Sequence, residues 1–262
     1  MTAKPIIELR NVYKSFGNKH VLQGLNLTVY EGETFVILGP SGCGKSVSLK
    51  IITGLLRPDA GIITVKGQCI NTMNLAELNQ ARMDFGMLFQ NAALFDSLTV
   101  GENIAFSLKE HGSFSDAEIK SIINEKLRMV GLPGIANKMP SELSGGMRKR
   151  IGLARAIALQ PKIIFYDEPT TGLDPIMSTE IDLLVTKLQR ELKVTSVVIT
   201  HDMKSAFRIA DRVGLHYQGK IWEVSTPEKF KLSKNPFVQQ FIKGEPENPH
   251  DLLGLPGEGE TK

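Results

Sequence analysis

The sequence predicts an α/β fold with a mixed sheet core, antiparallel strands at its N-terminal end and an inserted helical subdomain. Three patterns indicate it. Residues 6–14 and 20–29 mix β-branched and apolar residues with polar ones around a short glycine-containing turn, as in an antiparallel strand pair. From residue 162 onward strand and helix patterns alternate, which favours a parallel sheet flanked by helices. Residues 91–158 between them carry few strand signals and form the expected helical subdomain.

The remaining elements follow from local composition. An apolar strand is expected at 34–38, and after a glycine-rich turn a helix is expected at 45–55. We expect one domain over residues 1–244 and a tail over 245–262, which is rich in Pro, Gly and Glu. The other expected strands are 62–65, 68–70, 162–166, 194–199, 213–217 and 220–224, and the other helical stretches are 98–132, 145–159, 177–192 and 203–210.

Composition excludes several classes of protein. Hydrophobic residues make up 42% of the 262 residues, which is enough for a core. The net charge of +3 is too small for a nucleic-acid-binding face, so no nucleic acid is expected. Cys43 and Cys69 match no metal or redox pattern and are expected to be reduced thiols in a cytosolic protein. The start is unlike a signal peptide, and no run approaches the roughly 18 apolar residues of a membrane span, so a membrane role is expected to come through a partner.

A glycine-rich segment at 39–46 predicts a phosphate site because it matches G-x-x-x-x-G-K-[ST] between a strand and a helix. Such a loop turns its backbone N–H groups inward around an anion, and the helix that follows presents its positive end. Lys45 is expected to reach the β- and γ-phosphates of ATP, and Ser46 to supply a hydroxyl to Mg²⁺. The segment consists of Gly39, Pro40, Ser41, Gly42, Cys43, Gly44, Lys45 and Ser46.

Two carboxylates end the apolar strand expected at 162–166. A buried strand delivers its terminal residues to the sheet edge where ligands of α/β proteins bind. Asp167 is therefore expected to hold Mg²⁺ through water, and Glu168 to orient and activate the attacking water. Downstream of a phosphate loop, this pair predicts nucleotide hydrolysis.

Further motifs resemble those of ABC ATPases, in that family's order and over about residues 5–230. Segment 143–147 resembles the signature motif and is followed by a basic helix, and segment 172–175 resembles the D-loop. The individual residues that carry the resemblance are Phe16 for the aromatic beside adenine, Gln90 for the Q-loop, Ser144, Gly145 and Gly146 for the signature, Asp174 for the D-loop and His201 for the switch histidine.

The resemblance implies a P-loop ABC ATPase whose sites are shared by two copies. The signature would face the ATP of a twofold-related copy, so a homodimer would hold two identical sites. His201 would contact the γ-phosphate and keep Glu168 and water in line, and Gln90 would serve both catalysis and the Mg²⁺ site. Plainer interpretations stay open: Phe16 as a hairpin core residue, His201 as a core histidine, and the run 148–150 as a solvated helix face. The other histidines, His216 among them, have no partner motif and are treated as ordinary.

One departure points to a subfamily. Met147 stands where the common signature has Gln, and this version, with segments 91–100, 174–176 and 200–207, resembles the ATPases of phospholipid-trafficking transporters. That subfamily maintains outer-membrane lipid asymmetry and has relatives in chloroplasts and actinobacteria. It implies a multispanning permease, a substrate-binding protein of the mammalian-cell-entry type, a small cytoplasmic regulator, and a peripheral location on the cytoplasmic face of the inner membrane.

Other functions remain as alternatives. The same machinery could import an amino acid or an organic solvent. A soluble ABC protein of translation or DNA repair would usually have two cassettes or a long coiled-coil insertion, which this chain lacks. A non-catalytic nucleotide-binding module is disfavoured by the presence of Lys45, Asp167, Glu168 and His201.

Two surfaces are expected to meet partners. An apolar cluster of Phe89, Leu94, Phe95 and Leu98 follows the Q-loop and is expected to receive a permease helix, unless it packs the helical subdomain. Near the C-terminus, Phe237, Val238 and Phe241 form one apolar helical side. With Leu252, Leu253 and Leu255 of the tail, this region is expected to contact a neighbouring protein or to stay disordered.

Overall fold

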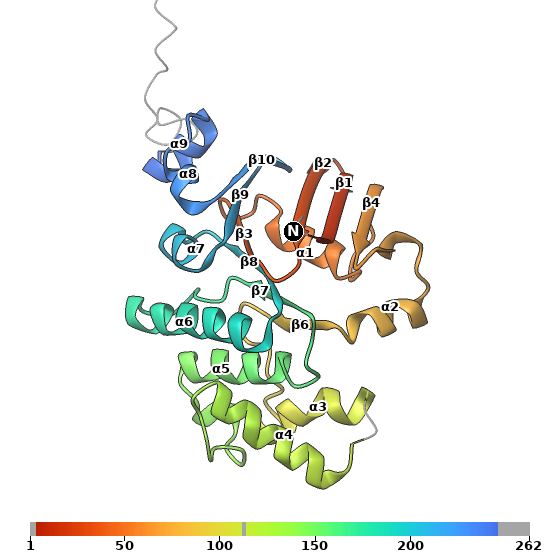
Figure 1. Ribbon diagram of the computed structural model, residues 1–262, viewed down its shortest axis with the longest axis vertical. Helices are drawn as coiled ribbons and strands as arrows, with labels where there is room; N and C mark the ends of the chain where they lie inside the picture. The colour runs from red at the N-terminus through yellow and green to blue at the C-terminus, as the bar shows by residue number, and fades with distance from the viewer. Residues whose placement is uncertain (1–3, 112–113, 246–262) are drawn as a thin grey trace, which may run out of the picture.

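Two sheets form the framework of the computed structural model, which describes residues 4–111 and 114–245 (Figure 1). The antiparallel sheet has the order β2-β1-β4-β5, and its strands are β1 (Pro5–Phe16), β2 (Lys19–Tyr30), β4 (Ala60–Val65) and β5 (Gln68–Cys69). The second sheet has the order β10-β9-β3-β8-β7-β6, and its strands are β3 (Thr34–Leu38), β6 (Phe85–Leu88), β7 (Ile163–Asp167), β8 (Thr195–Thr200), β9 (Arg212–Tyr217) and β10 (Lys220–Ser225).

Helices surround the second sheet. In Figure 1, α3 to α5 lie in the lower part of the view, and the antiparallel sheet lies at the upper right. No helix in the described ranges has the length and hydropathy needed to cross a membrane. The helices are α1 (Lys45–Ile52), η1 (Ile70–Thr72), α2 (Leu75–Arg82), α3 (Val100–His111), α4 (Asp116–Met129), η2 (Pro140–Glu142), α5 (Gly145–Ala156), α6 (Pro175–Leu192), α7 (Met203–Ile209), α8 (Pro227–Lys231) and α9 (Pro236–Lys243).

Strand pairing in the six-stranded sheet brings the functional segments together. Neighbours from β9 to β6 pair in parallel, and β10 joins β9 antiparallel. Leu38 at the end of β3 lies opposite Thr200, and Asp167 at the end of β7 lies opposite Ile199. The loops that follow β3, β7 and β8 therefore start at one sheet edge, where ligands of α/β folds bind.

Both faces of this sheet are covered, because successive side chains of a buried strand point to opposite sides. Val36 and Leu38 of β3 pack in one hydrophobic cluster with residues of α3 to α7. Phe35 and Ile37 pack in a second cluster with the antiparallel sheet and α1. The predicted mixed α/β fold with antiparallel N-terminal strands is confirmed.

Several element boundaries differ from expectation. The helix expected at 45–55 ends at Ile52, and Gly54 just beyond it has φ 68°, a left-handed conformation that stops a helix. Segment 68–70 is a strand only to Cys69, and η1 begins at Ile70. Helix α2 was not expected, because it buries only Leu78, although a capping box with Asn74 and Glu77 marks its start.

The segment after Asn235 does form a helix, but its apolar side faces its own chain. Val238 is buried, and Phe237 and Phe241 pack against the same core cluster as α7. Val238 is therefore not available to a neighbouring protein, whereas the expected contact of the C-terminal region with a neighbour stays a prediction. Leu252, Leu253 and Leu255 of the expected tail lie outside the described residues.

Candidate active site

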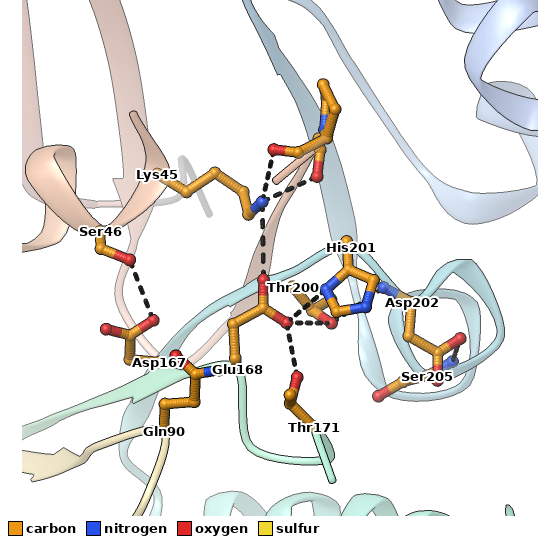
Figure 2. A network of polar contacts seen from close by, with 12 residues as sticks. Lys45, Ser46, Gln90, Asp167, Glu168, Thr171, Thr200, His201, Asp202 and Ser205 are labelled. Carbon is orange, nitrogen blue, oxygen red and sulfur yellow. Dashed lines mark hydrogen bonds and ion pairs between the residues drawn. The ribbon is translucent and has the colours of Figure 1, made fainter. Parts of the chain in front are cut away.

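A cleft of about 530 Å³ opens at the sheet edge where β3, β7 and β8 end. Segments far apart in the sequence meet there, and Figure 2 shows their polar network. The cleft is lined by Phe16, Lys19, Val21, Ser41, Gly42, Gly44, Lys45, Ser46, Val47, Gln90, Glu168, Thr171 and His201.

Two positions of the phosphate loop require glycine. A Cβ on Gly39 would lie 2.2 Å from the carbonyl oxygen of His216. Gly44 caps α1 with φ 109°, a conformation that L side chains rarely adopt. The N-terminal end of α1, with its unpaired N–H groups, thus starts at the cleft and favours negative charge. Cys43 of this loop is half-buried, and burial raises the pKa of its thiol.

Lys45 places a buried positive charge at the centre of the cleft. Its ammonium donates to the carbonyl oxygens of Gly39 at 2.8 Å and Pro40 at 2.9 Å. It also lies 3.5 Å from Oε1 of Glu168 (Figure 2). An ammonium held in this way is positioned to attract phosphate oxygens.

Glu168 is held by hydrogen bonds on its other oxygen. Oε2 accepts from the hydroxyls of Thr171 at 3.1 Å and Thr200 at 3.4 Å and lies 2.8 Å from Nδ1 of His201. The backbone of Glu168 is left-handed, with φ 49°, and its N–H donates to the carbonyl of Ile199. The His201 side chain is 48% exposed, so it can be reached from the cleft and is not a core histidine.

Ser46 and Asp167 form an oxygen pair beside this carboxylate. The Ser46 hydroxyl donates to Oδ1 of Asp167 at 3.2 Å, and burial raises the pKa of Asp167 against that hydrogen bond. Hydroxyl, amide and carboxylate oxygens are the donors that Mg²⁺ takes, so Ser46, Asp167 and the nearby Gln90 suit it chemically. Within the described ranges no group of three or more His, Cys, Asp or Glu residues could hold a metal. A metal here would need the phosphate oxygens of a nucleotide to complete its ligands.

Phe16 lies at the rim of the cleft, at the tip of the β1–β2 hairpin. Its side chain is 49% exposed, so the interpretation as a hairpin core residue is wrong. The ammonium of Lys14 lies 5.4 Å from the centre of its ring. The ring is available for stacking against a flat ligand.

The signature and D-loop residues stay out of this cleft. Ser144 and Gly145 are exposed, and the Ser144 hydroxyl accepts from the N–H of Met147 as the N-cap of α5. Asp174 is likewise exposed and caps α6 through the N–H groups of Ile176 and Met177. Gly146 is buried at the start of α5, where an added Cβ would meet the end of Met177. One chain therefore does not bring these residues to its own phosphate loop.

Two residues of the site were missed by sequence reasoning. The charge run 148–150 is not a solvated face, because Lys149 is buried and only Arg148 is exposed. The spacing of the buried positions Gly146, Lys149 and Leu153 on α5 was the available signal. His216, treated as ordinary, is buried 3.4 Å from the Ser48 hydroxyl behind the loop. Burial and the nearby Lys45 lower its pKa to about 4.

The fold and the cleft define a nucleotide-hydrolysing cassette, and residues 22–171 match the ABC transporter family. The chain belongs to this family, whose ATPase domains bind and hydrolyse ATP, as the sequence motifs had predicted. It is 42% identical to "Intermembrane phospholipid transport system ATP-binding protein MlaF" of Haemophilus influenzae, over 93% of this chain and 92% of that protein. It is also 42% identical to the chloroplastic "Protein TRIGALACTOSYLDIACYLGLYCEROL 3" of Arabidopsis thaliana, over 93% and 75% of the two chains.

A further relative and a solved structure complete the comparison. "Probable ribonucleotide transport ATP-binding protein mkl" of Mycobacterium tuberculosis is 42% identical, over 91% of this chain and 66% of that protein. The dimeric ATP-binding cassette MJ0796, solved in a post-hydrolysis state with ADP and phosphate, is 35% identical with a TM-score of 0.77. That match covers 84% of this chain and 98% of the other.

Proposed function

We propose that this chain is the ATP-hydrolysing subunit of a transporter that moves phospholipid or a related lipid between membranes. The observation that carries the hydrolytic part is the convergence of Lys45, Glu168 and His201 on one cleft. The lipid part is supported by the names of two relatives, one a phospholipid transport protein and the other named after a galactolipid.

The geometry suggests a role for each residue of the cleft. Backbone N–H groups of the loop and Lys45 would bind the phosphates, and the adenine would stack on Phe16. Glu168 would take a proton from the attacking water, and His201 would keep that carboxylate oriented through their 2.8 Å contact. Ser46, Gln90 and Asp167 would hold Mg²⁺, which neutralises charge on the transferred phosphate when bound.

The exposed signature supports a homodimer. Ser144, Gly145, Gly146 and Asp174 would face the nucleotide on a second copy, because they do not line the cleft of their own chain. The positive end of α5 suits that anion. A twofold interface would create two such sites at once, and the dimeric form of MJ0796 is in line with this arrangement.

An apolar groove of about 440 Å³ is the proposed docking surface for a multispanning permease. Phe89, Phe95 and Phe106 line it and are exposed, and the rings of Phe95 and Phe106 lie 4.7 Å apart. Leu94, which the sequence had placed in this surface, instead packs against the chain's own core. A substrate-binding protein of the mammalian-cell-entry type, a small cytoplasmic regulator and a location on the cytoplasmic face of the inner membrane complete the proposal.

A different cargo is the competing hypothesis. The mycobacterial relative is named for ribonucleotide transport, and an amino acid or an organic solvent would use the same motor. This subunit would not touch the cargo, so the cargo is identified by its transport in cells.

Cargo is tested by deleting the protein and restoring either the wild type or Glu168→Gln. Phospholipid content of separated membranes is measured by mass spectrometry, and uptake of labelled ribonucleosides and amino acids is measured in the same cells. We expect deletion to redistribute phospholipid, and only the wild type to restore it. Unchanged phospholipid with lost solute uptake would overturn the lipid proposal and leave the motor intact.

A further inference from the structure

Lys149 is a buried cation that joins three functional segments. It lies in the second turn of α5 with 5% of its surface exposed. Its ammonium donates to the backbone carbonyl of Gln90 and to that of Glu168, the latter at 3.3 Å. One side chain thus ties the Q-loop and the end of β7 to the helix that begins at the signature.

The burial of Lys149 is costly and is compensated by its hydrogen bonds. Burial disfavours the charged form of Lys149 and lowers its pKa, while Asp167 and Glu168 act in the opposite direction. Among the described residues no carboxylate lies within 4 Å of its ammonium, so backbone carbonyls alone satisfy it. Replacing Lys149 by an apolar side chain would remove the donor from both carbonyls, and a buried acceptor left unsatisfied costs about 1–3 kcal/mol. Lys149 therefore fixes these two backbone segments, and both segments carry residues of the cleft.

The two carbonyls belong to residues whose side chains must be placed accurately. Glu168 holds a left-handed φ of 49°, and its carboxylate contacts Lys45 and His201 in the cleft. Gln90 lines the same cleft. Because Lys149 donates to both backbones, it fixes their positions relative to α5. It thereby limits the distance between the side chains of Gln90 and Glu168.

A second cation on α5 shows the same pattern further along. Arg155 donates to the carbonyls of Ala92 and Ala93 at 2.7 Å each. Both alanines have left-handed backbones, with φ 58° and 48°. Two side chains of α5 therefore donate hydrogen bonds to the backbone of the segment from Gln90 to Ala93.

We propose that Lys149 is a positioning residue that aligns Glu168 and Gln90 for hydrolysis and couples both to the signature helix. This inference rests on the proposed roles of Glu168 and Gln90. Lys149 acts through backbone carbonyls and touches no substrate, so its loss should reduce turnover more than nucleotide affinity.

The test compares steady-state ATP hydrolysis by the purified full chain and three variants of Lys149. Lys149→Met keeps the length and removes the donors, and we expect kcat to fall at least about 30-fold with KM for ATP within about threefold. Displacing a catalytic group by about 1 Å can cost roughly 100-fold, which sets the scale. Lys149→Gln restores an N–H donor and should recover kcat to within about fivefold of wild type. Lys149→Leu replaces Lys149→Met if the latter does not fold.

Lys126→Met is the matched control. Lys126 is another buried lysine, 1% exposed, but it pairs with Glu125 on α4, away from the cleft. Its replacement makes the same chemical change and should leave kcat unchanged.

Three results would overturn the inference. The first is a wild-type kcat for Lys149→Met. The second is an equal loss for Lys149→Gln and Lys149→Met. The third is failure of both apolar variants to fold while Lys126→Met folds, which would make Lys149 a folding residue. Glu168→Gln is assayed alongside: if it also keeps full turnover, the proposed site is wrong, whereas if it alone collapses, only the role of Lys149 fails.

Discussion

Replacing Glu168 by Gln changes one polar group of the candidate site and is expected to stop turnover while ATP stays bound. In the structure, Oε2 accepts from Thr171 and Thr200 and contacts His201, and an amide oxygen can take over these contacts. What the amide cannot do is accept the proton of the attacking water. It also carries no charge to attract Lys45, which lies 3.5 Å away but keeps its two carbonyl partners.

The expected magnitude follows from the role of a positioned base, which contributes about 10²- to 10⁴-fold in rate. At about 1.36 kcal/mol per tenfold, the barrier rises by roughly 3–5 kcal/mol. ATP affinity is expected to stay within about fivefold, because the phosphate loop, Lys45 and Phe16 are unchanged. Stalled hydrolysis should also lengthen the life of an ATP-bound dimer.

The assay measures phosphate release by the purified chain, equilibrium binding of ATP, and mass in solution by light scattering with and without ATP. Glu191→Gln serves as a control, since Glu191 is half exposed on α6 and lies 3.9 Å from Lys187 one turn earlier in the same helix. Turnover of Glu168→Gln within about fivefold of wild type would refute the assignment of the base. If Glu168→Gln loses turnover as expected but forms no dimer in the presence of ATP, the shared-site arrangement is refuted instead.

Two further predictions concern pH and docking. His216 has a pKa of about 4 in the folded chain and about 6.5 in the unfolded chain. Between these pH values the unfolded chain binds more protons, so the free energy of unfolding falls as the pH drops. The total loss is about 3 kcal/mol at most. Urea unfolding at pH 7, 5.5 and 4.5 should show this fall, and it should be smaller in His216→Gln than in wild type or in the exposed control His20→Gln; equal slopes would contradict it. Phe95→Asp should abolish co-purification with the permease and leave the unfolding midpoint nearly unchanged, because Phe95 is 43% exposed. Leu94→Asp should instead destabilise the fold, and a permease that binds Phe95→Asp normally would remove the groove from consideration.

Local sequence patterns predicted most of the fold and those parts of the candidate site that are formed by consecutive residues. Three such parts can be identified from neighbouring residues alone. They are the phosphate loop, the strand that ends in Asp167 and Glu168, and the helix that starts after Ser144. Periodicity also placed the antiparallel pair and most helices to within a few residues.

What failed depended on contacts between distant segments. Lys149 looked like part of a solvated run because its acceptors, the carbonyls of Gln90 and Glu168, lie far away in the chain. The sequence did not show that Leu94 packs against the core while Phe95 is exposed. The left-handed backbone at Ala92 and Ala93 interrupts the periodicity of buried and exposed positions just before them. His216 gives no sequence signal, since its burial arises from β9 pairing next to β3 and the loop that follows.

The left-handed backbone of Glu168 places a strained conformation at the residue that carries the proposed chemistry. A residue with a Cβ held at φ 49° costs about 1–3 kcal/mol, whereas Gly adopts that conformation freely and Asn tolerates it well. Substituting Gly would relieve the strain but would also remove the proposed base and the contacts of its carboxylate with Lys45, Thr171 and His201. Engineers who want a hardier cassette should leave this position alone and look for stability at sites remote from the nucleotide.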